Sequence, residues 1–190
     1  MRRPDALEQQ HLHAFCTFDE DQEEYLCGFI DSDGNVVIPP KYEVAEDFSE
    51  GLALVAEFGW GSSYCFINTY GEVVIPLREG ITVLGAFHDG LCVVDVDGKH
   101  GYIDKSGSIT IAPQFNIAYD FKHGVALVSS ADDDNHWGFI DKTGRTIVPL
   151  KYRRAEPPTF WYTDDGLLRL LDGNETYYFD TSGKQIWPKE

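Results

Sequence analysis

The chain of 190 residues carries 32 acidic and 15 basic side chains, and its net charge of −17 repels phosphate backbones and anionic lipid head groups. This excludes nucleic acid and membrane surfaces as expected partners and favours a basic one. No segment approaches the roughly 20 apolar residues of a membrane helix, and the first residues lack the apolar stretch of a signal peptide, so we expect a soluble, cytoplasmic protein.

The chain divides into a short amino-terminal segment, residues 1–13, and one long repetitive domain, residues 14–190. Within the segment, residues 4–12 are compatible with a short helix, because Pro4 can occupy its first turn. The repetitive part has no internal boundary. In its first copy we place Phe15 to Phe18 on a strand and residues 19–24 in the loop that follows.

The repetition is clearest in a short apolar sequence motif that ends in Asp or Asn and is followed three residues later by Gly. Its copies begin at Gly28, Cys65, Gly101, Gly138 and Tyr177, which places successive copies 37, 36, 37 and 39 residues apart. A period of this size is typical of solenoids, propellers and other repeat arrays.

Each copy contains three short apolar runs, and each run predicts a strand. The first run follows a Phe-x-x-Gly sequence, as Leu91 follows Phe87 and Gly90. The second run is the repeated apolar motif itself. The third is a run such as Val36 to Ile38. Because proline cannot donate a ladder hydrogen bond, we expect each third strand to end at its proline. These prolines are Pro39, Pro76, Pro113 and Pro149.

The Asp-x-x-Gly sequence between the second and third runs predicts an antiparallel hairpin. The Asp side chain can accept hydrogen bonds from the backbone of its own turn, and Gly tolerates the positive φ that such a turn requires. We therefore expect a structural rather than a catalytic role for the turn aspartates, which are Asp31, Asp104, Asp141 and Asp180.

The predicted fold class is all-β, an array of five roughly 37-residue three-stranded antiparallel repeats. A unit this small must bury its apolar side against its neighbours. An open superhelical stack is favoured over a five-bladed propeller, since 37 residues are few for a four-stranded blade. A propeller would need a fourth strand from linkers such as residues 42–48 or 81–87.

The fourth copy reads Trp-Gly-Phe-Ile-Asp-Lys-Thr-Gly over residues 137–144, followed by Pro149, Lys151 and Tyr152, and resembles the WG β-repeat of bacterial proteins. The resemblance extends from about Ala14 to Pro188, although only Trp137 and Gly138 keep the dipeptide in register. It implies a bacterial β-repeat protein for which no general biochemical activity is established, and it supplies no catalytic residues.

Four cysteines, Cys16, Cys27, Cys65 and Cys92, stand where the repeat places small or half-buried residues. No zinc-binding spacing is present, so we expect reduced thiols. No catalytic or phosphate-binding motif occurs, and the six histidines are scattered, so we expect no enzymatic activity and no cofactor.

Acidic residues cluster in the predicted loops between the first and second strands of the repeats. Carboxylate oxygens suit calcium, but no cluster matches the EF-hand loop, with Gly sixth and Glu twelfth, so we predict no metal site. Equivalent loops of an array project from one edge, where their charges would form an acidic rim. Its residues are Asp19, Glu20, Asp21, Glu23, Glu24, Asp95, Asp97, Asp132, Asp133, Asp134, Asp172 and Glu175.

The favoured hypothesis is a non-enzymatic protein that binds a basic protein through this rim, with Phe160, Trp161 and Tyr162 as an aromatic anchor. A basic toxin domain has the right chemistry, in which case the chain would act as an immunity protein. The alternative is a module for carbohydrate or another small ligand, with Trp60, Trp161 and Trp187 as stacking platforms.

Overall fold

The computed structural model describes residues 11–20, 23–57, 64–132, 136–153, 161–163 and 165–189. Over these residues the chain is all-β, and none of them lies in a helix. This confirms that the fold class is all-β. The helix predicted over residues 4–12 falls almost wholly outside the described residues, and β1 begins at His13, one residue before the predicted start of the repeats.

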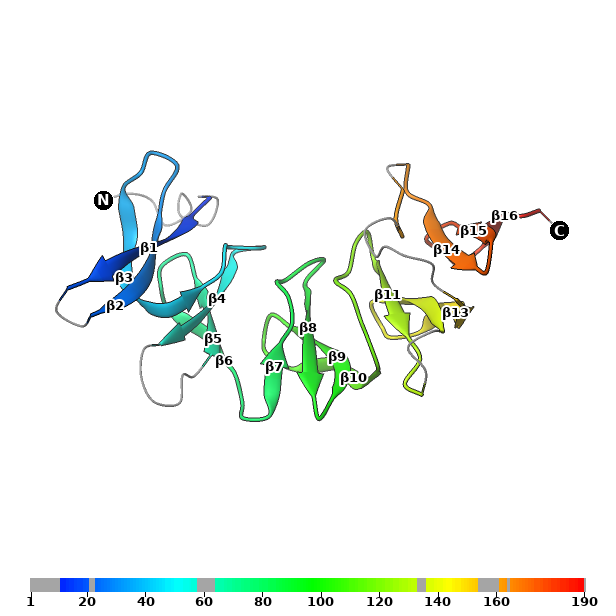
Figure 1. Ribbon diagram of the computed structural model, residues 1–190, viewed down its shortest axis with the longest axis horizontal. Coiled ribbons are helices and arrows are strands. Elements are labelled where there is room, and N and C mark those ends of the chain that lie inside the picture. The colour runs from blue at the N-terminus through cyan, green and yellow to red at the C-terminus, as the bar shows by residue number, and fades with distance from the viewer. Residues whose placement is uncertain are drawn as a thin grey trace. The chain divides into compact units, whose positions relative to one another are not determined.

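The strands fall into antiparallel triplets in chain order, which we call repeats 1 to 5 (Figure 1). Repeat 1 comprises β1 (His13–Asp19), β2 (Glu24–Ile30) and β3 (Val36–Ala45), and repeat 2 comprises β4 (Leu52–Glu57), β5 (Tyr64–Asn68) and β6 (Val73–Pro76). Repeat 3 comprises β8 (Leu91–Val96), β9 (Lys99–Asp104) and β10 (Ile109–Phe115), preceded by the short β7 (Ile81–Val83). Repeat 4 comprises β11 (Val125–Ser129), β12 (Trp137–Asp141) and β13 (Thr146–Tyr152), and repeat 5 comprises β14 (Leu168–Asp172), β15 (Glu175–Phe179) and β16 (Gln185–Trp187).

The chain separates into two compact units, one made of Met1–Glu79 with Lys105–Gly107 and the other of Gly80–Asp104 with Ser108–Glu190. In the first unit, β1 to β6 form one six-stranded sheet in sequence order. The second unit contains a four-stranded sheet in the order β10-β9-β8-β7 and two three-stranded sheets. Over the described residues, none of these sheets closes into a barrel.

The linkers between repeats add a short fourth strand, within the residues 42–48 and 81–87 from which the propeller alternative required one. The end of β3 pairs with β4, with Val44 opposite Ala56, and β7 pairs with β8, with Thr82 opposite Asp95. A single β-bridge joins Ala118 to Val128 in the same way. Each of these linkers therefore pairs with the free edge of the first strand in the following repeat, so that this edge is no longer exposed.

The prediction that every third strand ends at its proline is wrong for three of the four prolines. Strands β3, β10 and β13 continue through Pro39, Pro113 and Pro149, and their pairing with the second strand shifts register at that point. A bulge leaves a residue outside the ladder, so the missing proline N–H is not needed there. Only β6 ends at its proline, Pro76.

The glycine at the first position of the repeated apolar motif leaves space for the backbone of this bulge. A Cβ on Gly138 would lie 2.8 Å from both the Leu150 nitrogen and the Pro149 carbonyl carbon, and one on Gly101 would lie 2.7 Å from the Pro113 nitrogen. Such approaches exclude any side chain. Repeat 2, which has Cys65 at this position, is also the repeat whose third strand has no continuation past the proline.

The turn aspartates have the structural role that the sequence predicts. Asp141 Oδ1 accepts hydrogen bonds from the Thr143 nitrogen at 2.9 Å and the Arg145 nitrogen at 3.1 Å, and Asp31 and Asp180 bind their own turns equivalently. The Thr143 hydroxyl also donates to Asp141, and this hydrogen bond is the main reason that the pKa of the carboxyl is lowered. The turn glycine Gly144 has a φ of 81°.

The hydrophobic core lies between successive repeats rather than inside them. One buried cluster joins Phe29 and Ile38 of repeat 1 to Val55 and Ile67 of repeat 2. The corresponding clusters join repeat 3 to repeat 4 and repeat 4 to repeat 5. Repeat 4 therefore buries one apolar face on repeat 3 and the other on repeat 5, as expected for a repeat array.

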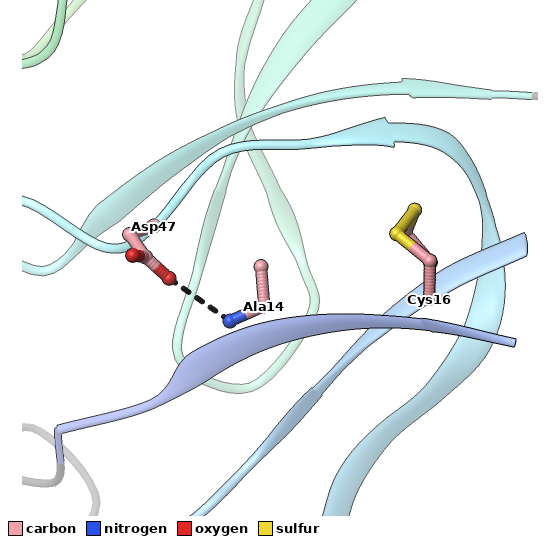
Figure 2. Close-up of a disulfide and its surroundings, with 4 residues drawn as sticks. Ala14, Cys16 and Asp47 are labelled. Atoms are coloured by element: carbon pink, nitrogen blue, oxygen red, sulfur yellow. Dashed lines mark hydrogen bonds between the residues drawn. A yellow bond between two sulfur atoms is a disulfide. The ribbon is translucent and has the colours of Figure 1, made fainter.

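The expectation of four reduced cysteines is wrong for one pair. Cys16 of β1 and Cys27 of β2 lie directly opposite each other and form a disulfide, with their Cα atoms 4.0 Å apart (Figure 2). Figure 2 also shows the Ala14 nitrogen donating to Asp47 Oδ1 at 3.0 Å, which attaches β1 to the linker after β3. Cys65 and Cys92 are free and buried.

Candidate protein-binding surface

The described rim residues lie in the connections between the first and second strands of their repeats, or on the ends of the strands that flank those connections. Asp19 ends β1 and Glu24 begins β2; Asp95 and Asp97 lie at the β8–β9 turn; Asp132 lies after β11. Asp172 and Glu175 flank the β14–β15 turn, and Glu20 and Glu23 lie between β1 and β2. Asp21, Asp133 and Asp134 lie outside the described residues.

Two of these turns place carboxylates directly opposite each other. Asp19 pairs in register with Glu24, and Asp172 pairs with Glu175. Like charges at facing positions of an antiparallel ladder are destabilising. The prediction placed Asp19 and Glu24 in a loop, but they are the last paired residues of their strands, so the like-charge contact was not anticipated.

In the second unit, the acidic turns of repeats 3 and 4 are neighbours. The Lys99 ammonium, at the start of β9, donates a hydrogen bond to the carbonyl oxygen of Ala131, next to Asp132. Asp95 lies on the same β8–β9 hairpin, where its Oδ1 accepts a hydrogen bond from the Gly98 nitrogen at 3.2 Å. The carboxylates Asp95, Asp97 and Asp132 therefore belong to one local surface.

In the fifth repeat, the side chain of Tyr177 contacts the acidic turn. Tyr177 donates a hydrogen bond from its hydroxyl to Glu175 Oε2 at 2.8 Å. This hydrogen bond is the largest cause of the raised pKa of Tyr177, since it stabilises the protonated phenol beside the carboxylate. The turn thus presents two carboxylates, Asp172 and Glu175, together with an aromatic ring.

The predicted aromatic anchor is only partly accessible. Phe160 lies outside the described residues, and Trp161 and Tyr162 are half-buried. Trp161 packs against Phe139, with 5.5 Å between ring centroids, and Tyr162 stacks on His123 at 4.8 Å. The Lys122 ammonium also lies over the Tyr162 ring, 4.9 Å from its centroid. Both rings therefore hold the linker of repeat 5 against repeat 4.

Three tryptophans were considered as stacking platforms for a small ligand. Trp60 lies outside the described residues, and Trp161 packs against Phe139. Trp187, on β16, is 56% exposed. Beside it lies a hollow of about 590 Å³, lined by Thr163, Asp165, Leu167, Tyr178, Ile186, Trp187 and Lys189. The sequence indicated Trp187 but not this hollow, which the fold assembles from the approach to β14 and from β15 and β16.

Over the described part of the chain, two His–carboxylate pairs are formed that the sequence did not single out, and one of them places His100 Nε2 3.9 Å from Asp95 Oδ2. His88 Nε2 lies 3.6 Å from Asp120 Oδ2, and the nearby Cys92 donates from its thiol to the carbonyl oxygen of Gly85. Burial raises the pKa of the Cys92 thiol to about 12, so this sulfur stays protonated and is a poor nucleophile at neutral pH. Burial also raises the pKa of Asp120, and His88 opposes that rise.

Among the described residues, no group of three or more His, Cys, Asp or Glu side chains is placed to hold a metal ion. The same residues contain no helix that is long and apolar enough to cross a membrane.

The described fold and surface define an all-β repeat protein whose repeats share their cores and whose first hairpin turns carry carboxylates. A comparison with protein families gives the more specific class: the family described as WG containing repeat matches residues 28–57, 101–130 and 137–159. The chain is a WG-repeat protein. A comparison with curated proteins found no match.

Proposed function

We propose that this WG-repeat protein is a non-enzymatic binding protein whose acidic rim docks on a basic protein. The observation that carries the proposal is the placement of carboxylates opposite each other at Asp19–Glu24 and Asp172–Glu175. Such pairs lower the stability of the free protein, and a cationic side chain from a partner would relieve the repulsion. A need for solubility alone favours dispersed charge, not facing pairs.

The partner that we propose is a basic toxin domain, which the chain would neutralise as an immunity protein. A surface of this kind speeds association with a positively charged partner and discriminates against acidic ones. The acidic turns lie at the ends of strands, so a partner could reach them without disturbing the cores between repeats. The half-buried rings of Trp161 and Tyr162 would contribute at most a partial contact.

The test uses the whole chain and a panel of basic nuclease toxin domains, with binding measured by calorimetry between about 0.05 and 0.5 M salt. Affinity should fall steeply as salt rises, because counterions screen the rim. The double variant Asp19→Asn with Glu24→Gln should weaken binding about tenfold or more. The control, Glu46→Gln with Glu79→Gln, removes the same charge from exposed residues outside the rim and should have a smaller effect.

Equal losses in the two double variants would show that only the net charge matters and would contradict the rim. Affinity that does not depend on ionic strength would remove the electrostatic argument altogether. The absence of binding to every basic domain, together with a response of tryptophan fluorescence to glycans, would favour the small-ligand alternative.

A further inference from the structure

The β1–β2 hairpin of repeat 1 is longer than the equivalent hairpins over the described residues. Strands β1 and β2 form seven residue pairs, whereas the first two strands of repeats 2 to 5 form five or six. Alignment on the repeated apolar motif shows that the extra pairs are the outermost two. These pairs join Phe18 to Tyr25 and Asp19 to Glu24.

The rings of Phe18 and Tyr25 form an exposed aromatic pair on this extension. They meet edge to face, with 5.2 Å between their centroids. Phe18 is 49% exposed and Tyr25 is 67% exposed. A single exposed aromatic side chain is ordinary, but two in contact form an apolar patch that a binding partner would cover.

The two rings lie on the face of repeat 1 that packs against repeat 2. Side chains alternate between the faces of a strand, so Phe18 and Tyr25 share a face with the pairs Cys16–Cys27 and Ala14–Phe29. Phe29 and Ala14 pack in the cluster that joins repeat 1 to repeat 2. The exposure of the rings therefore arises on an internal face of the array, where the hairpin extends past the last described pair of β4 and β5.

The disulfide fixes the part of the hairpin that carries the rings. Cys16 and Cys27 face each other two positions before Phe18 and Tyr25, on the same face of the ladder. The bond holds the register of the two strands next to the aromatic pair. A contact surface that is ordered in advance loses less conformational entropy when a partner binds.

The charges beside the rings indicate which partner this patch fits. Asp19 and Glu24 adjoin Phe18 and Tyr25 in sequence, and Glu20 and Glu23 lie in the connection beyond them. Residues 13–30 contain no lysine and no arginine. An apolar patch beside carboxylates disfavours an acidic partner and favours a side chain that is both flat and cationic.

Arginine matches both features of this tip better than lysine does. Its guanidinium is planar and weakly hydrated, so it stacks on an aromatic ring while its N–H groups donate to a nearby carboxylate. The lysine ammonium is a strongly hydrated point charge and gains less from the ring.

We propose that the tip of the β1–β2 hairpin, with the Phe18–Tyr25 pair at its centre, binds an arginine side chain of the basic partner protein. This inference rests on the proposed function, for which it names the anchoring contact. The guanidinium stacks on a ring and donates hydrogen bonds to carboxylates of the same tip. The exposed pair thereby takes the role that the sequence assigned to the half-buried Trp161 and Tyr162.

The test compares two peptides of equal length and charge, hexa-arginine and hexa-lysine, by calorimetry with the full chain at about 0.15 M salt. The arginine peptide should bind at least about threefold more tightly. The variant Phe18→Ala with Tyr25→Ala should weaken its binding about tenfold, to the level of the lysine peptide. The control, Tyr64→Ala, removes a ring that is 45% exposed in repeat 2 and should leave both affinities unchanged.

A second variant separates stacking from apolar contact. Phe18→Leu with Tyr25→Leu keeps an apolar patch at the tip but removes both ring faces, so it should also lose the preference for arginine. An unchanged preference in either double variant would overturn the proposal. Thermal unfolding of the variants should match that of the unchanged chain within a few degrees, because both rings lie outside the buried clusters.

The outcomes distinguish this site from the acidic rim as a whole. Equal affinity for the two peptides would overturn the arginine site, and the rim would still stand if both affinities fall with salt and in Asp19→Asn with Glu24→Gln. No binding of either peptide would also overturn the site and leave the toxin domains to test the rim. A ring-dependent preference for arginine without affinity for any toxin domain would support the site and refute only the proposed partner.

Discussion

At the scale of single residues, the glycine of the Trp-Gly dipeptide explains why this motif accompanies a proline eleven residues later. The bulge at the proline brings backbone atoms over the glycine, as at Gly138 and Pro149. A side chain at that position would have to displace the backbone of the third strand and break its pairing. The motif is therefore a packing requirement of the hairpin.

We accordingly expect Gly138→Ala to lower the free energy of unfolding by about 2 kcal/mol or more, because the new Cβ would meet backbone atoms at 2.8 Å. Cys65→Ala changes the equivalent position of repeat 2, where a side chain is already present, and should cost about 1 kcal/mol or less. Denaturant unfolding of both variants measures the difference. Equal stabilities would contradict the steric role of Gly138.

At the scale of elements, the hairpin of β1 and β2 differs from the other first hairpins because it is covalently closed. The Cys16–Cys27 disulfide joins residues separated by 11 in sequence. It crosses the hairpin that carries Asp19 and Glu24, so it opposes the opening that their repulsion favours. The other repeats have no disulfide among the described residues and rely on the clusters between repeats.

Reduction of this disulfide should lower the free energy of unfolding by about 2–3 kcal/mol, as expected for a loop of this length. Unfolding in the presence and absence of a reducing agent measures the effect. The variant Cys16→Ser should show the lower stability in both conditions and no response to the reductant. A response that persists in this variant would assign the effect to another thiol.

At the scale of the whole molecule, the net charge of −17 opposes compaction, and the facing carboxylates add to this repulsion locally. The buried clusters between repeats supply the stabilisation that offsets it. We therefore expect salt to stabilise the folded protein by screening the repulsion among its carboxylates.

We expect the melting temperature of the chain to rise by a few degrees between about 0.02 and 0.3 M sodium chloride, since screening weakens the repulsion among carboxylates. The variant Asp19→Asn with Glu24→Gln should begin from a higher melting temperature and respond less to salt. Scanning calorimetry measures both. A melting temperature that falls with salt would indicate that attractive ion pairs outweigh the repulsion.

Sequence periodicity was sufficient for the fold class, the hairpin turns and the order of the strands. This is because short apolar runs, Asp-x-x-Gly turns and glycine steps are local signals that recur in every copy. The same periodicity located the acidic turns in chain order. It did not predict that Asp19 faces Glu24 or that Cys16 faces Cys27, because register depends on the number of loop residues, which differs between copies.

The amino-acid sequence by itself determined that this protein is a β-repeat array with acidic first turns, since each signal is contained within a few adjacent residues. Only the tertiary structure decided which side chains are covered. Trp187 and Ile38 follow the same local pattern, yet one is exposed and the other buried, because burial depends on whether a neighbouring repeat packs against that face. Exposure, and with it the surface available for binding, is thus a property of the assembled repeats.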